Sequence, residues 1–200
     1  MGRLGIFGGT FDPPHLGHLI LAAEAVAQLC LEQVLWVLTP DPPHKEGQLL
    51  TELDYRLDMV EAAISDNSSF QISRVDIDRP APHYALDTVR LLAKIHPRDE
   101  LIYLMGGDSL HDLPAWHLPK LFVKVCDGIG VMRRPGDEVD MESLEILLPG
   151  ILKKICFIDT PLIEISSSDI RLRVTQGKSI RYYLPAPVYQ IIQQKRLYQI

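Results

Sequence analysis

RLGIFGGTFDPPHLGH, at residues 3–18, joins a short apolar run to two glycines, two prolines and a segment of helical periodicity. Arg3–Phe7 is apolar and ends at the glycine pair, which is typical of a buried strand followed by a turn. From Leu16 onwards, apolar residues recur at helical spacing, and the prolines just before them mark a helix start. The segment therefore predicts a strand, a turn and an amphipathic helix.

The same alternation of apolar runs and helical segments continues along the chain. We expect further strands at Gln33–Leu38, Phe70–Val75, Glu100–Met105, Asp127–Met132 and Lys154–Ile158. We expect further helices at Asp54–Ser65, Tyr84–Ile95, Met141–Leu148, Ser167–Gln176 and Pro187–Tyr198. Alternating elements of this kind predict a Rossmann-like, doubly wound α/β fold with a mostly parallel sheet. No linker of low complexity interrupts residues 1–200, so we expect a single domain.

Composition and charge restrict the class of function. The chain has 200 residues, of which 46% are hydrophobic and 23% charged, and its net charge is −6. An acidic balance argues against a nucleic-acid surface, and no apolar run is long enough to span a bilayer. The three cysteines are far apart and form no CxxC pair, which suits a reducing compartment. We expect a cytoplasmic protein without nucleic-acid or membrane partners; a homo-oligomer stays open.

The first segment also contains candidate phosphate-binding residues. Gly8 and Gly9 follow the predicted strand, at the edge where open α/β sheets bind ligands, and they lack a Cβ that would keep phosphates away. The helix that follows would offer N–H groups to an anion. His15 and His18 are three residues apart and would face the same way, while Gly17 leaves room for a phosphate. A bare HxxH pair would equally fit two core histidines, and a zinc pair lacks a third ligand at a recognisable spacing.

Two other stretches have the residue types of a nucleotide site. Ser166–Ser168 would cap a helix, and Arg171 on that helix could bond phosphate oxygens in pairs. Gly106 and Asp108 follow the Glu100–Met105 strand, where a carboxylate could accept hydrogen bonds from a ribose. Trp116 lies in a proline-containing loop and could stack on a flat ring. Taken singly, each stretch also fits a plain structural role.

Together these motifs resemble a known superfamily. GGTFDPPHLGH and ISSSDIR, about 150 residues apart, are similar to the two signatures of the HxGH nucleotidylyltransferases, with Ser168 in place of the usual threonine. PPHK at 42–45, GGDSL at 106–110, the tryptophan and the YLPAPV tail at 183–188 resemble bacterial nicotinate-nucleotide adenylyltransferases over essentially the whole chain. The resemblance implies transfer of AMP from ATP to nicotinate mononucleotide, which yields nicotinate adenine dinucleotide and pyrophosphate in NAD biosynthesis.

The resemblance also implies roles for individual residues. The catalytic set would be His15, His18 and Arg171. The residues expected to bind ATP are Gly8, Gly9, Thr10, Phe11, Gly17, Gly106, Asp108, Ser166, Ser167 and Ser168. The residues expected to bind the mononucleotide are His44, Lys45, Tyr84, Thr88 and Trp116. Mg²⁺ would arrive with ATP, without a dedicated protein site, since no carboxylate pair presents itself.

Other functions remain to be separated by experiment. A related adenylyltransferase could use nicotinamide mononucleotide or phosphopantetheine as acceptor. A non-catalytic module could bind ATP without turning it over. Class I aminoacyl-tRNA synthetases share HxGH, but a chain of 200 residues leaves no room for a tRNA-binding domain.

Overall fold

The structure is a computed structural model that describes residues 2–42, 49–132, 139–161 and 164–199. One parallel sheet runs through it in the order β3-β2-β1-β4-β5-β6. Its strands are β1 (Arg3–Gly9), β2 (Gln33–Leu38), β3 (Phe70–Ser73), β4 (Glu100–Gly106), β5 (Gly128–Met132) and β6 (Ile155–Ile158). The predicted doubly wound α/β fold is confirmed, and every strand pair in the described part of the chain is parallel.

The predicted helices are present within a few residues of their expected bounds. They are α1 (Leu16–Leu29), α2 (Leu53–Ile64), α3 (Ala85–Ile95), α6 (Met141–Leu147), α7 (Ser167–Thr175) and α8 (Ala186–Lys195). Helix α8 ends earlier than predicted because Arg196 takes a left-handed conformation, at φ 51°. None of the helices in the described ranges is long and apolar enough to cross a membrane.

Two short helices were not expected from the sequence. These are α4 (Gly107–Asp112) and α5 (Pro119–Val125), which follow β4 together with the 3₁₀ turn η2 (Leu113–Ala115); a second such turn, η3 (Ile151–Lys153), precedes β6. Pro119 stands at the first position of α5 and is a helix start signal, but the helix is too short for a helical period to stand out in the sequence. These elements carry the chain away from the carboxyl end of β4.

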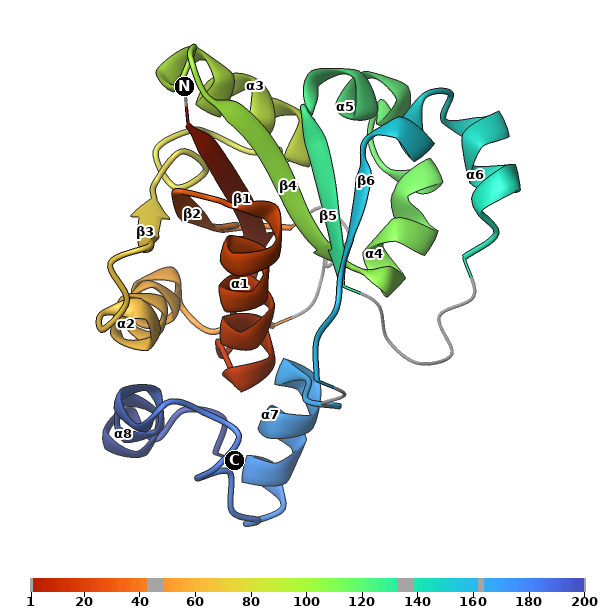
Figure 1. Cartoon of the computed structure of the whole chain (residues 1–200). Coiled ribbons are helices and arrows are strands. Elements are labelled where there is room, and N and C mark those ends of the chain that lie inside the picture. The colour runs from red at the N-terminus through yellow and green to blue at the C-terminus, as the bar shows by residue number, and fades with distance from the viewer. Residues whose placement is uncertain (1, 43–48, 133–138, 162–163, 200) are drawn as a thin grey trace.

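Each face of the sheet packs against its own group of helices, as Figure 1 shows. Along β2, Val34, Trp36 and Leu38 join the core beneath α1 and α2, whereas Leu35 and Val37 join the core beneath α3 and α5. This alternation follows from the two-residue period of a strand, and both faces are apolar because both are covered. Two layers of helices therefore hold a central sheet.

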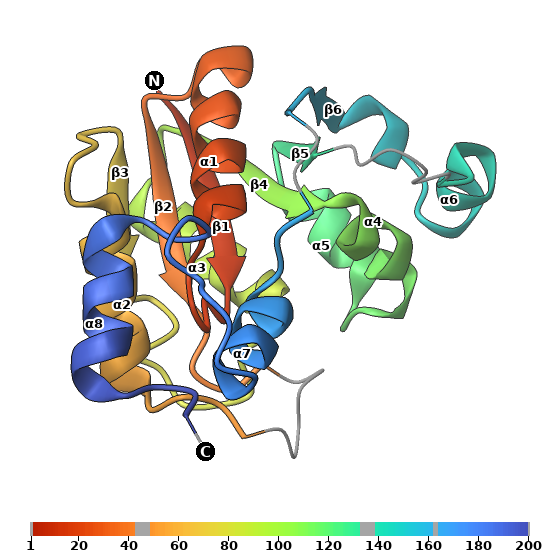
Figure 2. The same ribbon diagram turned by 90° about the horizontal axis from the view of Figure 1, so that it is seen from below.

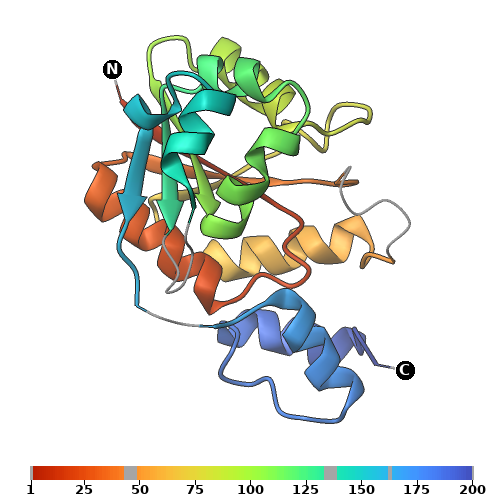
Figure 3. The same ribbon diagram turned by 90° about the vertical axis from the view of Figure 1, so that its right-hand side faces the viewer.

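The C-terminal helices lie beyond the carboxyl ends of the strands (Figures 1 and 3). Helix α8 packs on α2 and buries Val188 and Ile192 completely. Seen from below, α7 lies close to the end at which α1 begins (Figure 2). The last part of the chain thus returns to the segment that opened it.

Leu104→Ala tests the core. Leu104 lies on β4, is 1% exposed and packs beneath α1, so truncation should cost about 2–5 kcal/mol of unfolding free energy through lost burial and a cavity. Urea denaturation measures it. Leu147→Ala, at a leucine that is 52% exposed, should change stability by less than about 0.5 kcal/mol; equal losses in the two variants would contradict the described core.

Candidate active site

The glycines of the first segment, Gly8 and Gly9, and those that follow the Glu100–Met105 strand lie next to each other, at the ends of β1 and β4. From β1 the chain moves to β2 and β3 on one side, and then returns to β4 on the other. Such a switch in strand order opens a crevice at the carboxyl ends, where open α/β sheets bind ligands. Gly8 and Gly9 end β1, while Gly106 ends β4 and is followed by the exposed Asp108 in the first turn of α4. Both predicted nucleotide segments thus reach one edge.

The two glycines of β1 also serve the protein's own packing. A Cβ on Gly9 would lie 2.9 Å from the Phe11 ring, and a Cβ on Gly8 would lie 2.9 Å from the Tyr103 hydroxyl. Phe11 is itself in a left-handed conformation at φ 48°, which is uncommon for an aromatic residue. Its ring packs against Trp36 and, edge to face, against His18. The glycine pair therefore lets the loop fold back on the sheet, in addition to the predicted close approach of a phosphate.

The two histidines form a stacked pair at the start of α1. Their ring centroids are 3.7 Å apart and the planes differ by 24°, which confirms that they face the same way. His15 is the N-cap residue and is buried, while His18 is partly exposed. Nδ1 of His18 accepts the backbone N–H of His15 at 3.1 Å. A neutral imidazole that accepts at Nδ1 carries its proton on Nε2, so His18 presents Nε2–H as a donor.

The missing Cβ of Gly17 makes room for a side chain of the protein itself. A Cβ at this position would lie 3.1 Å from His15 Nδ1 and 3.8 Å from the carbonyl oxygen of Ile165. The His15 ring thus occupies the space beside Gly17, and a phosphate over the same turn stays a prediction. Gly17 allows that ring to lie flat over the first turn.

The start of α1 is also less open than expected. The N–H of Leu16 donates to the carbonyl of Tyr183 at 3.1 Å, and the N–H of His18 donates to the carbonyl of His15 at 2.9 Å. The expectation of unpaired N–H groups was therefore wrong for these two, because the C-terminal segment and the turn itself supply acceptors. These two N–H groups are therefore already paired with protein carbonyls, and the role of the histidine rings in phosphate binding stays a prediction.

The serine and arginine motif comes from the far end of the chain. Ser166 caps α7, its hydroxyl oxygen accepting the N–H of Asp169 at 3.1 Å. Ser167 donates to the carbonyl of Pro13 at 2.8 Å, and Arg171 donates through Nη1 to the carbonyl of Asp12 at 2.7 Å. Arg171 Nη2 lies 3.4 Å from the Ser168 hydroxyl. The two motifs, 154 residues apart at their nearest contact, form one site.

Of the residues expected to bind the mononucleotide, the structure describes Tyr84, Thr88 and Trp116, which lie on the other face of β4. Trp116 packs edge to face against Tyr103, whose hydroxyl reaches Gly8, so this group adjoins the glycine loop. Tyr84 caps α3, and its ring stacks on His117 with centroids 4.0 Å apart. Thr88 is buried, and its hydroxyl donates to Asp76 at 2.8 Å, so its side chain already has a structural partner. His44 and Lys45 lie outside the described residues.

A buried cluster beside the site was missed by sequence reasoning. Arg56 is 3% exposed, and its guanidinium donates to the carbonyls of Thr10, Thr39, Pro40 and Thr51 at 2.8–3.2 Å. Burial lowers the pKa of Arg56, while the carboxylates of Asp12 and Asp41 oppose this shift. A signal existed, because Arg56 shares the apolar stripe of Met59, Val60 and Ala63 on α2. An arginine on a buried helix face must find carbonyl or carboxylate partners.

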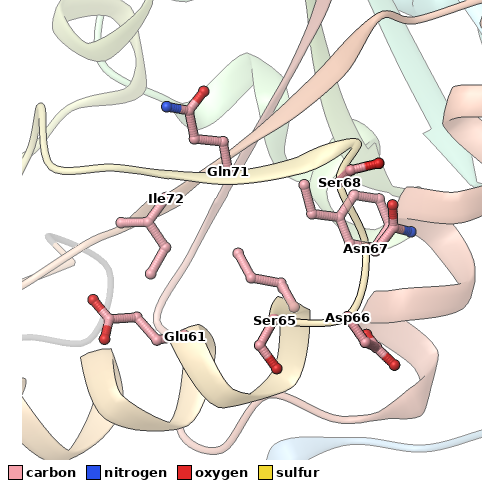
Figure 4. A pocket seen from close by; sticks show the side chains of 9 residues that line it. Glu61, Ser65, Asp66, Asn67, Ser68, Gln71 and Ile72 are labelled. Atoms are coloured by element: carbon pink, nitrogen blue, oxygen red, sulfur yellow. The ribbon is translucent and has the colours of Figure 1, made fainter.

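A hollow of about 560 Å³ lies elsewhere, between the end of α2 and β3. Figure 4 shows Glu61 and Ser65 on one side of it and Gln71 and Ile72 on the other. None of the residues singled out from the sequence lines it. We therefore place the candidate site at the carboxyl ends of β1 and β4, where the strand order switches, rather than at this hollow. Within the described residues, no group of three or more His, Cys, Asp or Glu side chains could hold a metal ion.

Comparison with known proteins identifies the family. The cytidylyltransferase-like family model matches residues 6–173. A protein of Thermomicrobium roseum named "probable nicotinate-nucleotide adenylyltransferase" is 44% identical over 199 residues, which span 100% of this chain and 92% of the relative. A protein of the same name from Geobacillus thermodenitrificans is 40% identical, over 99% of this chain and 87% of the relative. The chain belongs to the nicotinate-nucleotide adenylyltransferase family.

The family's fold is seen in a solved structure as well. Plasmodium falciparum nicotinic acid mononucleotide adenylyltransferase, complexed with NaAD, superposes with a TM-score of 0.81 at 21% identity, covering 99% of this chain and 98% of that one. At such low identity the match concerns the fold. In this chain the HxGH histidines are stacked on each other beside Gly17, and the backbone N–H of His15 donates to the His18 ring.

Gly17→Ala tests that arrangement. Alanine is the better helix former by up to about 1 kcal/mol, so the melting temperature should hold or rise. The new Cβ would lie 3.1 Å from the His15 ring and push it aside, so kcat should fall about tenfold through misplacement of the site. Calorimetry and steady-state kinetics on one preparation measure both effects. A variant with kcat within twofold of wild type would show that the ring position is unimportant.

Proposed function

We propose that the protein transfers AMP from ATP to nicotinate mononucleotide, giving nicotinate adenine dinucleotide and pyrophosphate, a step in NAD biosynthesis. One observation carries the proposal: the HxGH segment and the ISSSDIR segment, far apart in the chain, are bonded to each other through Arg171 and Asp12. Full-length relatives carry the name of this activity. In this proposal the protein supplies a preformed loop, around which its side chains bind the phosphates of the substrates.

The chemistry needs alignment and charge neutralisation more than proton transfer. The phosphate of the acceptor is already anionic near pH 7, because its second pKa is about 6, so it can attack the α-phosphate without a general base. His18 would donate its Nε2–H, and His15 would lie beside it, where negative charge develops. Arg171 and the Ser166–Ser168 turn would bind the departing phosphates. Mg²⁺ bound to ATP would supply neutralisation of charge on the pyrophosphate.

The acceptor is the first point to test. Pyrophosphate release with ATP and Mg²⁺ should be at least about tenfold higher in kcat/KM with nicotinate mononucleotide than with nicotinamide mononucleotide. The physical reason is that the N-terminal end of α3, near Tyr84 and Trp116, favours a negative substituent on the ring. Equal use of both acceptors, preference for phosphopantetheine, or ATP binding without turnover would refute the proposed acceptor.

His18→Asn tests the donor. The side-chain oxygen of asparagine can stand where Nδ1 stands and still accept the N–H of His15, whereas the Nε2–H donor is lost. We expect kcat to fall about 10²- to 10³-fold, as when one preorganised donor is removed, with ATP affinity falling less. His111→Asn, at a histidine whose side chain is 77% exposed, is the matched control and should behave as wild type. Retention of kcat in His18→Asn would remove the histidine from the mechanism.

A further inference from the structure

The carboxylate of Asp12 lies in an environment that phosphate binding does not explain. Asp12 is 2% exposed and belongs to the loop between β1 and α1. Its Oδ2 accepts the N–H of Thr51 at 3.2 Å, and its Oδ1 accepts the hydroxyl of Tyr198 at 2.7 Å. A buried carboxylate is costly unless each oxygen has a donor, so both contacts matter for keeping it there. Tyr198 comes from the far end of the chain, 186 residues away.

The same residue is held from its other side by the candidate active site. The backbone carbonyl of Asp12 accepts Arg171 Nη1 at 2.7 Å, and the next carbonyl, that of Pro13, accepts the Ser167 hydroxyl at 2.8 Å. The loop then reaches His15, the residue that stacks on His18. Whatever fixes the Asp12 side chain therefore also fixes the peptide that Arg171 contacts and the point where the histidine pair begins.

The C-terminal segment adopts an uncommon backbone to make this contact. Arg196 and Tyr198 both have positive φ angles, of 51° and 63°, in a region that residues other than glycine rarely occupy. Burial, together with the negative charge of Asp12 and the hydrogen bond to it, raises the pKa of the Tyr198 hydroxyl above the usual range. The hydroxyl therefore keeps its proton and donates throughout the neutral pH range.

We propose that Tyr198 is a positioning residue for adenylyl transfer: by its hydrogen bond to Asp12 it fixes the loop that carries His15 and that Arg171 contacts. This inference rests on the proposed function for its kinetic readout. Tyr198 touches neither substrate in this scheme and acts through its hydrogen bond to Asp12; the same hydroxyl also lies 4.0 Å from Met59 Sδ. Loss of the hydroxyl should therefore impair alignment of the reacting groups more than binding of either substrate.

Tyr198→Phe removes the hydroxyl alone, and Tyr182→Phe, at a tyrosine that is 84% exposed, is the matched control. We expect kcat of Tyr198→Phe to fall about tenfold, as a small misplacement of catalytic groups does. KM for ATP and for the mononucleotide should stay within about threefold of wild type. The imidazole ¹H–¹⁵N signals of His15 and His18 should shift in Tyr198→Phe and stay in place in Tyr182→Phe.

The outcomes separate a positioning role from a structural one. Tyr198→Phe with wild-type kcat and unshifted imidazole signals would overturn the proposal. A lower melting temperature with unchanged kcat of the folded enzyme would assign Tyr198 to stability alone and overturn it as well. If wild-type protein formed no dinucleotide, the proposed function would fail, whereas the imidazole signals would still decide whether Tyr198 positions the histidine pair.

Discussion

A buried guanidinium is the constraint on which the candidate site depends. Placing the charge of Arg56 inside the protein costs several kcal/mol unless its N–H groups are satisfied. The acceptors are backbone carbonyls of the loops that follow β1 and β2, together with Thr51 before α2. Since displacement of one of these carbonyls would leave a buried N–H group without that acceptor, the loops are held in one arrangement. The glycine turn, Phe11 and the histidine pair all belong to the segment whose Thr10 carbonyl Arg56 holds in place.

Both polar contacts and apolar packing fix the shape of the loop between β1 and α1. On one side, Phe11 enters the aromatic group around Trp36, and the glycines of β1 leave space for it. On the other side, carbonyl groups of the same loop accept hydrogen bonds from Ser167 and Arg171. A loop bound on both sides before a nucleotide arrives has little entropy left to lose, which is the condition for preorganised catalysis.

The sequence predicted what depends on local periodicity and on motifs at strand ends. The parallel sheet followed from the alternation of elements, and the common direction of the His15 and His18 side chains followed from their spacing. Helices α4 and α5 were missed because they are too short for a helical period to stand out. The cluster of Arg56, Asp12 and Tyr198 could not be derived, because its members meet only through the tertiary fold. Likewise, only packing could show that the room beside Gly17 belongs to the His15 ring.

The bond between Tyr198 and Asp12 has a consequence for biosynthesis. The two residues are 186 positions apart, and synthesis at about 5–20 residues per second separates them by roughly 10 to 40 s on the ribosome. During that interval β1, α1 and the histidine segment exist as nascent chain, whereas the partners supplied by α7 and by Tyr198 do not. The loop therefore reaches its final form only after Tyr198 has been translated. The protein can therefore align its nucleotide substrates only after Tyr198 has been synthesised and has bound Asp12.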